Sequence, residues 1–211
     1  MPTLYVRLPE DRIGALIGPG GQTKRKIEEK TGTEIEVDTE EGEVQLSSRV
    51  EGDPMGVLQA RDITLAIGRG FSPDRAFRLL KDDTYLGVLD IKEVTGKRAK
   101  GALRRIRSRV IGEGGKARQR IEDLSGCSVS VYGTTVALIG QEAQLERATR
   151  AVQLLLKGSE HAAVFHLLAR LRDEALRDEA IEPSELPSPV CPPWGRSSAS
   201  TPGRSSGPGV C

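Results

Sequence analysis

The stretch that decides the fold is residues 17–37, which read IGPGGQTKRKIEEKTGTEIEV. Residues 111–131 read IGEGGKARQRIEDLSGCSVSV, so the same pattern returns at a constant shift of 94 positions. Glycines, helix-face isoleucines and basic residues recur in register: Gly18 with Gly112, Ile27 with Ile121, and Lys24 with Arg118. Such a repeat predicts a duplicated supersecondary unit, in which a glycine loop opens onto a basic helix.

The elements around the two glycine stretches follow one order, judged from the alternation of apolar residues in strands and their helical spacing elsewhere. The first copy is expected to contain Thr3–Leu8, Asp11–Ile17, Gln22–Lys30, Glu34–Asp38, Glu43–Ser47 and Pro54–Ile67. The second copy is expected to contain Tyr85–Ile91, Arg98–Ile111, Lys116–Leu124, Ser128–Tyr132, Thr135–Ile139 and Glu142–Leu156. The fold class is therefore α+β, with two β-α-α-β-β-α units, each a three-stranded sheet covered by helices.

We expect five segments along the chain. These are a first unit at 1–70, a linker helix within 71–83, a second unit at 84–158, a C-terminal helix at 159–181 and a tail at 182–211. Ser72 before Pro73 suits the N-cap of the linker helix. The tail is rich in proline, serine and glycine, which predicts disorder because it leaves almost nothing to bury.

Composition excludes several classes of protein. Net charge is near zero, with 31 basic and 30 acidic residues, but ten basic residues and one acid lie between Lys97 and Arg120. Such a run beside a glycine loop favours a polyanionic partner. The three cysteines have no zinc or redox spacing, which favours a reducing cytosol. No signal peptide or membrane span is evident, so we expect a cytoplasmic protein with no membrane partner.

Two nucleotide-binding motifs fail at the glycine stretches. An NTPase phosphate loop needs Ser or Thr after Gly115-Lys116, where Ala117 stands, and a glycine where Val110 stands. A dinucleotide fingerprint needs a third glycine at the positions of Thr23 and Ala117. Neither cofactor is supported, and we expect none.

The pattern I-G-x-G-G, a basic helix, T/S-G and a strand resembles the KH domain. The resemblance implies two type I KH units, whose G-x-x-G loop clamps about four single-stranded nucleotides. Glycines admit phosphate close to the main chain, and the next helix offers N–H groups and a positive dipole end. The candidate RNA-binding residues are Gly18, Pro19, Gly20, Gly21, Lys24 and Arg25, and Gly112, Glu113, Gly114, Gly115, Lys116, Arg118, Arg120, Arg104, Arg107 and Arg109.

Bases would be read by an aliphatic groove, because an aromatic content of 3% disfavours a stacking platform. The expected groove residues are Ile17, Ile27 and Ile35, and Ile111, Ile121 and Val129. Pro19 removes a backbone donor from the first loop, and Glu113 places a negative charge in the second. A KH fold that no longer binds RNA therefore stays open, although the more basic second unit is expected to be the main clamp.

Three further segments sharpen the resemblance. They are RIRSRVIGEGG at 105–115, SVYGTTVALIG at 130–140 and LLKGSEH at 155–161. Over about residues 1–175 the chain is similar to the KH proteins of small-subunit ribosome assembly, the "partner of Nob" or Dim family, in its short archaeal form. This implies binding of small-subunit rRNA precursor near its 3′ end, beside the processing endonuclease. Eukaryotic members have a degenerate first KH unit, whereas this first loop keeps its glycines.

The sequence also bears on two other classes of function. An enzyme is disfavoured, because His161 and His166 lie off the i,i+4 spacing and no catalytic pair stands near the loops, so no catalytic or metal residues are proposed. The alternative is a KH-fold scaffold that mainly docks a protein such as the endonuclease. An apolar stripe on the C-terminal helix could serve it, formed by Val164, Leu167, Leu168, Leu171 and Ala175.

Overall fold

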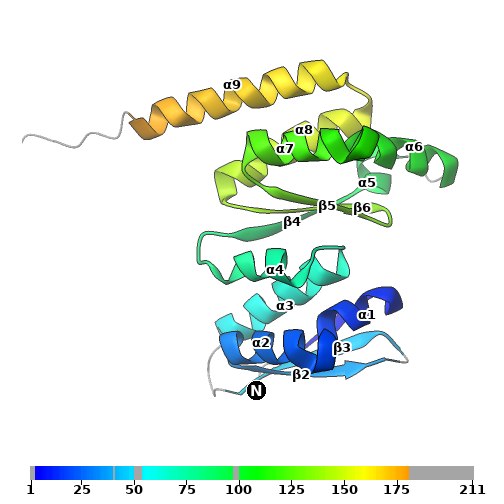
Figure 1. The fold of residues 1–211 in the computed structure, drawn as a ribbon, viewed down its shortest axis with the longest axis vertical. Helices are drawn as coiled ribbons and strands as arrows, with labels where there is room; N and C mark the ends of the chain where they lie inside the picture. Colours follow the sequence, from blue (N-terminus) through cyan, green and yellow to red (C-terminus); the bar gives the residue numbers. More distant parts are fainter. Residues whose placement is uncertain (1–2, 40, 50–53, 97–99, 181–211) are drawn as a thin grey trace, which may run out of the picture.

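The computed structural model describes residues 3–39, 41–49, 54–96 and 100–180 (Figure 1). The predicted disordered tail at 182–211 and the predicted helix start at Arg98 lie outside these residues. Within them, both copies of the predicted β-α-α-β-β-α order are present, which confirms the α+β class.

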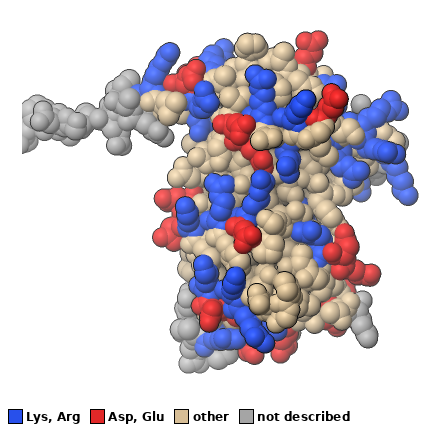
Figure 2. Space-filling model, in the orientation of Figure 1, with Lys and Arg blue, Asp and Glu red and all other residues tan. Residues whose placement is uncertain are grey.

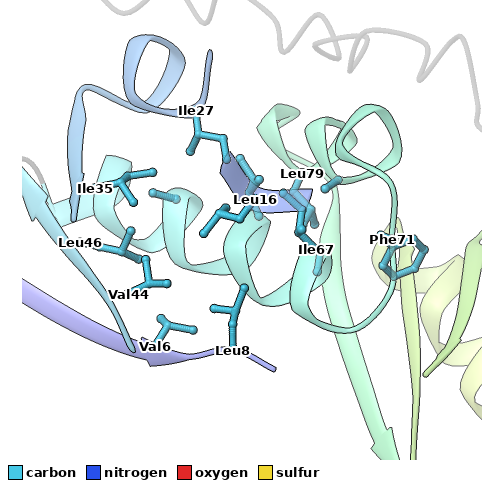
Figure 3. Packing of buried hydrophobic residues seen from close by; sticks show 14 of the residues in the cluster. Val6, Leu8, Leu16, Ile27, Ile35, Val44, Leu46, Ile67, Phe71 and Leu79 are labelled. Atoms are coloured by element: carbon cyan, nitrogen blue, oxygen red, sulfur yellow. The ribbon is translucent and has the colours of Figure 1, made fainter. Parts of the chain in front are cut away.

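The first unit comprises β1 (Thr3–Arg7), α1 (Glu10–Ile17), α2 (Gln22–Thr31), β2 (Thr33–Asp38), β3 (Glu43–Ser48) and α3 (Pro54–Gly68). Its antiparallel sheet has the order β1-β3-β2, with Val44 paired to both Val6 and Val37. Inward residues of the strands alternate with outward polar ones, as expected for a sheet covered on one face. Figure 3 shows Leu16, Ile27 and Leu46 meeting in the core between this sheet and its helices.

The second unit comprises β4 (Tyr85–Asp90), α5 (Ile91–Thr95), α6 (Lys100–Ile111), α7 (Lys116–Ser125), β5 (Ser128–Tyr132), β6 (Thr135–Gly140) and α8 (Glu142–Lys157). Its sheet has the matching order β4-β6-β5. The short helix α5 was not predicted. It forms because the Asp90 carboxylate accepts a hydrogen bond from the N–H of Lys92 at 2.7 Å, an N-cap that ends the strand one residue early.

The segment between the units is less regular than predicted. It forms α4 (Pro73–Ala76) followed by a 3₁₀ turn, η2 (Phe77–Leu80), rather than one helix over 72–81. Ser72 occupies the N-cap position, but its side chain makes no capping hydrogen bond.

The C-terminal helix α9 (His161–Ala180) lies across α7 and α8. Val164 and Leu168 are 1% and 0% exposed, so the predicted apolar stripe mainly covers the protein's own second unit. Among the described helices, none is long and apolar enough to cross a lipid bilayer.

The two units stack as layers (Figure 1). The second sheet lies between its own helices and the helices α3 and α4, while the first sheet closes the far end of the stack. Strand β6 is buried on both faces, because Val136 and Leu138 pack in the second core and Ala137 and Ile139 pack with the first. This stacking brings the connecting segment beside the second glycine unit.

Candidate nucleic-acid interface

The two glycine loops have nearly the same backbone geometry. Gly20 and Gly114 both have φ of 58°, and Gly21 and Gly115 have φ of 77° and 80°. These positive values favour glycine over other residues. A Cβ added at any of the four would meet nothing within 4 Å, so their backbone is open to close approach by a ligand.

The first glycine of each loop has a different task. A Cβ on Gly112 would lie 2.5 Å from the Cβ and 2.8 Å from the backbone nitrogen of Ala117. A Cβ on Gly18 would collide with the hydroxyl of Thr23 in the same way. Gly18 and Gly112 therefore let the loop pack directly on the helix that follows, which fixes the loop relative to the helix N-terminus.

Each loop opens onto an uncapped helix N-terminus. Gly21 and Gly115 are the N-cap residues of α2 and α7, and neither has a side chain that could accept from the first turn. Such N–H groups, together with the positive end of the helix dipole, are suited to bind an anion such as phosphate. Pro19 and Glu113, the central residues of the two loops, are both exposed.

A groove runs beside α2 in the first unit. It forms a hollow of about 380 Å³ lined by Ile17, Gly21, Lys24, Arg25, Glu28 and Val37. The cationic side chains and Gly21 of the first loop thus line the same hollow as the apolar side chains of Ile17 and Val37. This arrangement can hold a phosphodiester at one side and an apolar face of a base at the other.

Four of the predicted groove residues are buried. Ile27, Ile35, Ile121 and Val129 are all 0% exposed, so their side chains belong to the core beneath the groove, and their part in reading bases stays a prediction. They point into the core because apolar side chains on the inward face of α2, α7 and the edge strands pack under the helices. Ile17 and Ile111 are half-buried, as are Val37 and its repeat partner Val131, which sequence analysis missed.

The predicted basic residues of the second unit divide into two groups. Lys116 stands exposed at the start of α7, and Arg118 is half-buried on the α7 face that corresponds to Lys24. Arg120 lies about 200° around the helix from Arg118 and stacks over Phe165, with 4.9 Å from the guanidinium carbon to the ring centroid. Arg120 therefore faces α9 rather than the side of α7 that carries Arg118, and its predicted contact with RNA stays a prediction.

The arginines of α6 also separate. Arg109 donates to the carbonyl oxygens of Gly158 and Ser159, at 3.2 and 2.7 Å, and His161 Nε2–H donates to the carbonyl of Arg109 at 2.8 Å. Arg109 thus ties α6 to the α8–α9 turn, a structural role that differs from the predicted RNA contact. Arg107 donates to the carbonyl of Gly133 at 3.3 Å, and Arg104 is exposed.

Figure 2 shows the surface over α6 dominated by lysine and arginine, at the right of the view. The basic residues of α6 therefore contribute to a positively charged surface, whereas Arg109 is held by the α8–α9 turn and Arg120 by Phe165. Among the described residues, no group of His, Cys, Asp or Glu is arranged to hold a metal ion. Cys127 is 1% exposed, and burial raises the pKa of its thiol to about 11, which leaves it unreactive at neutral pH.

One acidic residue of each unit has a role that sequence analysis missed. Glu28 Oε1 accepts a hydrogen bond from the N–H of Ile35 at 3.0 Å, and Glu122 Oε1 accepts one from the N–H of Val129 at 2.7 Å. Each glutamate joins the second helix to the free edge of the sheet. Their recurrence at the shift of 94 positions was the available signal.

Comparison with known proteins supports these two units. Residues 85–173 match a family model described as a eukaryotic type KH-domain (KH-domain type I), and residues 3–65 match a KH domain model. The chain is 40% identical over 172 residues to KH domain-containing protein MJ0443 of Methanocaldococcus jannaschii, covering 82% of this chain and 75% of that protein. It is 31% identical over 146 residues to pre-rRNA-processing protein pno1 of Schizosaccharomyces pombe, covering 68% of this chain and 59% of that protein.

Solved structures give the same picture. The chain is 50% identical to Dim2p from Pyrococcus horikoshii, with a TM-score of 0.76 over 81% of this chain and 99% of that one. Dim2p is also known in a complex with a/eIF2alpha and rRNA, to which the chain is 49% identical with a TM-score of 0.77, covering 82% of this chain and 95% of that one.

Proposed function

Because the chain belongs to the two-KH-domain family that includes Dim2p and the pre-rRNA-processing protein pno1, we propose that it binds single-stranded RNA of the small-subunit rRNA precursor. The observation that carries the proposal is the open glycine loop at an uncapped helix N-terminus, present twice beside cationic side chains. Its role is that of an assembly factor, in a family of RNA-binding and RNA-processing proteins rather than of enzymes.

The second unit is the main clamp in this proposal. Gly114 and Gly115 admit the phosphate, while Lys116 and Arg118 neutralise its charge. Gly112 contributes by packing the loop onto α7. The α6 patch, with exposed Arg104, extends the positive surface beside the loop. No catalytic step is assigned to these residues, and the cytoplasmic location and the endonuclease as a neighbour stay predictions.

The alternative of a protein-docking scaffold depended on the apolar stripe of α9, and this stripe is largely covered. The apolar stripe that could seat a partner helix lies against α7 and α8, with Val164 and Leu168 buried. Protein docking therefore needs another face of the molecule, whereas the RNA proposal uses groups that are open.

The proposal is tested by fluorescence anisotropy with a single-stranded RNA matching the 3′ end of small-subunit rRNA. The variant Gly114→Asp/Gly115→Asp places two carboxylates in open space at the phosphate site, and aspartate tolerates a left-handed backbone better than most residues. We expect affinity to fall by about tenfold or more, the effect of roughly 1.4 kcal/mol of like-charge repulsion.

The matched control is Gly20→Asp/Gly21→Asp, which makes the same change in the first loop. Circular dichroism establishes that both variants remain folded. A loss confined to the second loop supports the main clamp there, and binding should weaken steeply with salt because phosphate contacts release counterions. Unchanged affinity in both variants would show that the loops do not hold the RNA.

A further inference from the structure

The segment that joins the two units reaches the groove face of the second unit. In the first unit Lys24 and Glu28 line the groove, and the shift of 94 positions carries them to Arg118 and Glu122. Arg75, which belongs to neither repeat, places its Nη1 2.8 Å from Oε1 of Glu122. A guanidinium from the connecting segment therefore stands where the second groove should continue.

A hollow lies at this point between the two units. It has a volume of about 220 Å³ and is lined by Gly70, Phe71, Ser72, Arg75, Arg118, Val129 and Ser130. Arg118 comes from the α7 face of the groove, and Arg75 comes from the connecting segment on the other side. Two cations from separate elements thus flank one hollow at the free edge of β5.

The wall that carries Arg75 is held firmly in place. Ser130 Oγ donates to the carbonyl of Arg69 at 3.0 Å, and a Cβ on Gly70 would lie only 2.8 Å from Ser130 Oγ. Arg12 of α1 donates to the carbonyl of Phe71 at 2.7 Å and lies 5.9 Å from the ring centroid of Tyr132.

Tyr132 completes the contact between the units. Its hydroxyl donates to Asp11 Oδ1 at 2.6 Å, and this bond raises the pKa of the Tyr132 phenol. The hydrogen bonds and the close packing fix the connecting segment against the edge of β5, so the hollow exists before any ligand arrives.

The ion pair favours rather than prevents an anion at this site. Glu122 would repel phosphate if it stood alone, and Arg75 neutralises it while retaining further N–H donors on its five-donor guanidinium. Arg75 is 43% exposed at its side chain, so those donors are within reach of a ligand. In the first unit the nearest cations to Glu28 are Lys24 and Arg49 of the same unit, at 3.8 and 3.7 Å.

We propose that Arg75 and the hollow beside it form an additional RNA subsite, so that the second unit's binding surface is built from both units. A single strand clamped at Gly114 and Gly115 would continue along α7, and its next nucleotide would contact Arg118 and Arg75. This inference rests on the proposed RNA-binding function and deepens it. It assigns an RNA-contact residue to a segment that neither KH repeat contains.

The test compares two RNAs in anisotropy measurements on the full chain. A KH unit holds about four nucleotides, so one RNA has about four nucleotides and the other about eight. Arg75→Ala should weaken binding of the longer RNA by about fivefold, as expected from loss of roughly 1 kcal/mol in one charged contact, and leave the shorter RNA unchanged. Arg75→Lys should restore part of the lost affinity.

The matched control is Arg78→Ala. Arg78 Nη1 donates to Ser128 Oγ at 2.7 Å across the same junction, but Arg78 does not line the hollow. The Arg78→Ala variant should bind both RNAs with the affinity of the parent protein. The inference is overturned if Arg75→Ala binds the longer RNA normally, or if Arg78→Ala reproduces its loss, since the effect then comes from a loosened junction. A parent protein that binds neither RNA overturns the proposed function itself.

Discussion

The outer faces of the two sheets differ although the strands share order and register. In the second sheet the outward residues Ala137 and Ile139 are 0% exposed and pack with the first unit. The same register positions in the first sheet hold Gln45 and Ser47, beside Tyr5, which is 61% exposed. The second sheet therefore packs against the first unit through its outer face, whereas the outer face of the first sheet carries exposed side chains.

The difference in exposure between the two sheets corresponds to a difference in the sequences of their central strands, β3 and β6. Residues 44–47 read VQLS, the alternation of a strand with one wet face. Residues 136–139 read VALI, a continuous apolar run of the kind seen in strands covered on both faces. The second unit is therefore not an independent copy, because removing the first unit would expose one face of its sheet.

The largest loss of stability is expected from a substitution that disrupts the packing of the second sheet against the first unit. Ile139→Lys places an ammonium group between the second sheet and the first unit, within a cluster of buried apolar side chains where Ile139 is 0% exposed. We expect the free energy of unfolding to fall by about 4 kcal/mol, as for an unpaired buried charge. Urea denaturation measures the loss.

The matched change is Ser47→Lys, at the same register position of the first sheet. Its strand neighbours are Thr3 and Glu34, so the new cation would lie at the surface beside an acid. The free energy of unfolding should change by less than about 0.5 kcal/mol. Equal effects at the two positions would contradict the asymmetric stacking of the units.

Much of the fold could be predicted because the repeat constrained it twice. Nearly all element boundaries lie within two residues of the expected ones, since glycines end helices and strand alternation is clear. The packing of the two units into one body was expected, but the sheet face through which they pack was not, although the run at Val136 to Ile139 carried the signal. Helix α5 was missed because its N-cap, Asp90, lies within an apparently continuous strand.

The next largest effect is a difference in stability between substitutions at two glycines of the second loop. Gly112→Ala should lower the free energy of unfolding by about 2 kcal/mol or more, because its Cβ would overlap Ala117 and its φ is positive at 73°. Gly114→Ala should cost about 1 kcal/mol, since only the left-handed backbone opposes it. Thermal melting measures both variants. Equal losses would contradict the division into a packing glycine and an open one.

A smaller effect distinguishes the cores of the two units at high pH. Cys127 occupies the position that Thr33 holds in the first unit, by the same shift of 94 positions. Because burial raises the pKa of Cys127 from 9.0 to about 11, the folded state keeps its proton longer than the unfolded state. Its contribution is therefore complete below pH 9 and is lost as the pH rises toward 11.

At the middle of that window the loss amounts to about 1.4 kcal/mol, the value of one pKa unit. The measurement is urea denaturation of the parent and of Cys127→Ser across the window, because serine does not titrate there. The parent should lose more stability with rising pH than the variant. Parallel curves for the two proteins would rule out a titrating thiol in the core.

The candidate site was only partly readable from the sequence. The geometry of the two glycine loops could be predicted because it depends on residue type and spacing, while the contact of the loops and of Arg118 with RNA stays a prediction. Ile27 and Ile121 are fully buried, and the sequence could not separate a core residue from the floor of a groove because helical spacing fits both equally well. The ion pair between Arg75 and Glu122 could not be predicted, since Arg75 reaches Glu122 only through the stacking of the two units.

The smallest effect is a change in RNA affinity expected from substituting the residue at which the two loops differ in charge. Glu113 places an exposed carboxylate where phosphate should come, while Pro19 has no charge at the equivalent position. Glu113→Gln should raise RNA affinity by about two- to threefold, because an exposed like-charge contact costs roughly 0.5 kcal/mol. Anisotropy at low salt measures the gain, and added salt should reduce it, since screening weakens exposed charges first.

The reciprocal change, Pro19→Glu, asks whether the first loop holds RNA at all. If the strand touches both units, this variant should lose about the affinity that Glu113→Gln gains. If the first unit only supports the second, Pro19→Glu should bind RNA like the parent, while Arg75→Ala still weakens the longer RNA. The pair of variants thus separates a first unit that clamps RNA from one that contributes the wall beside the second clamp.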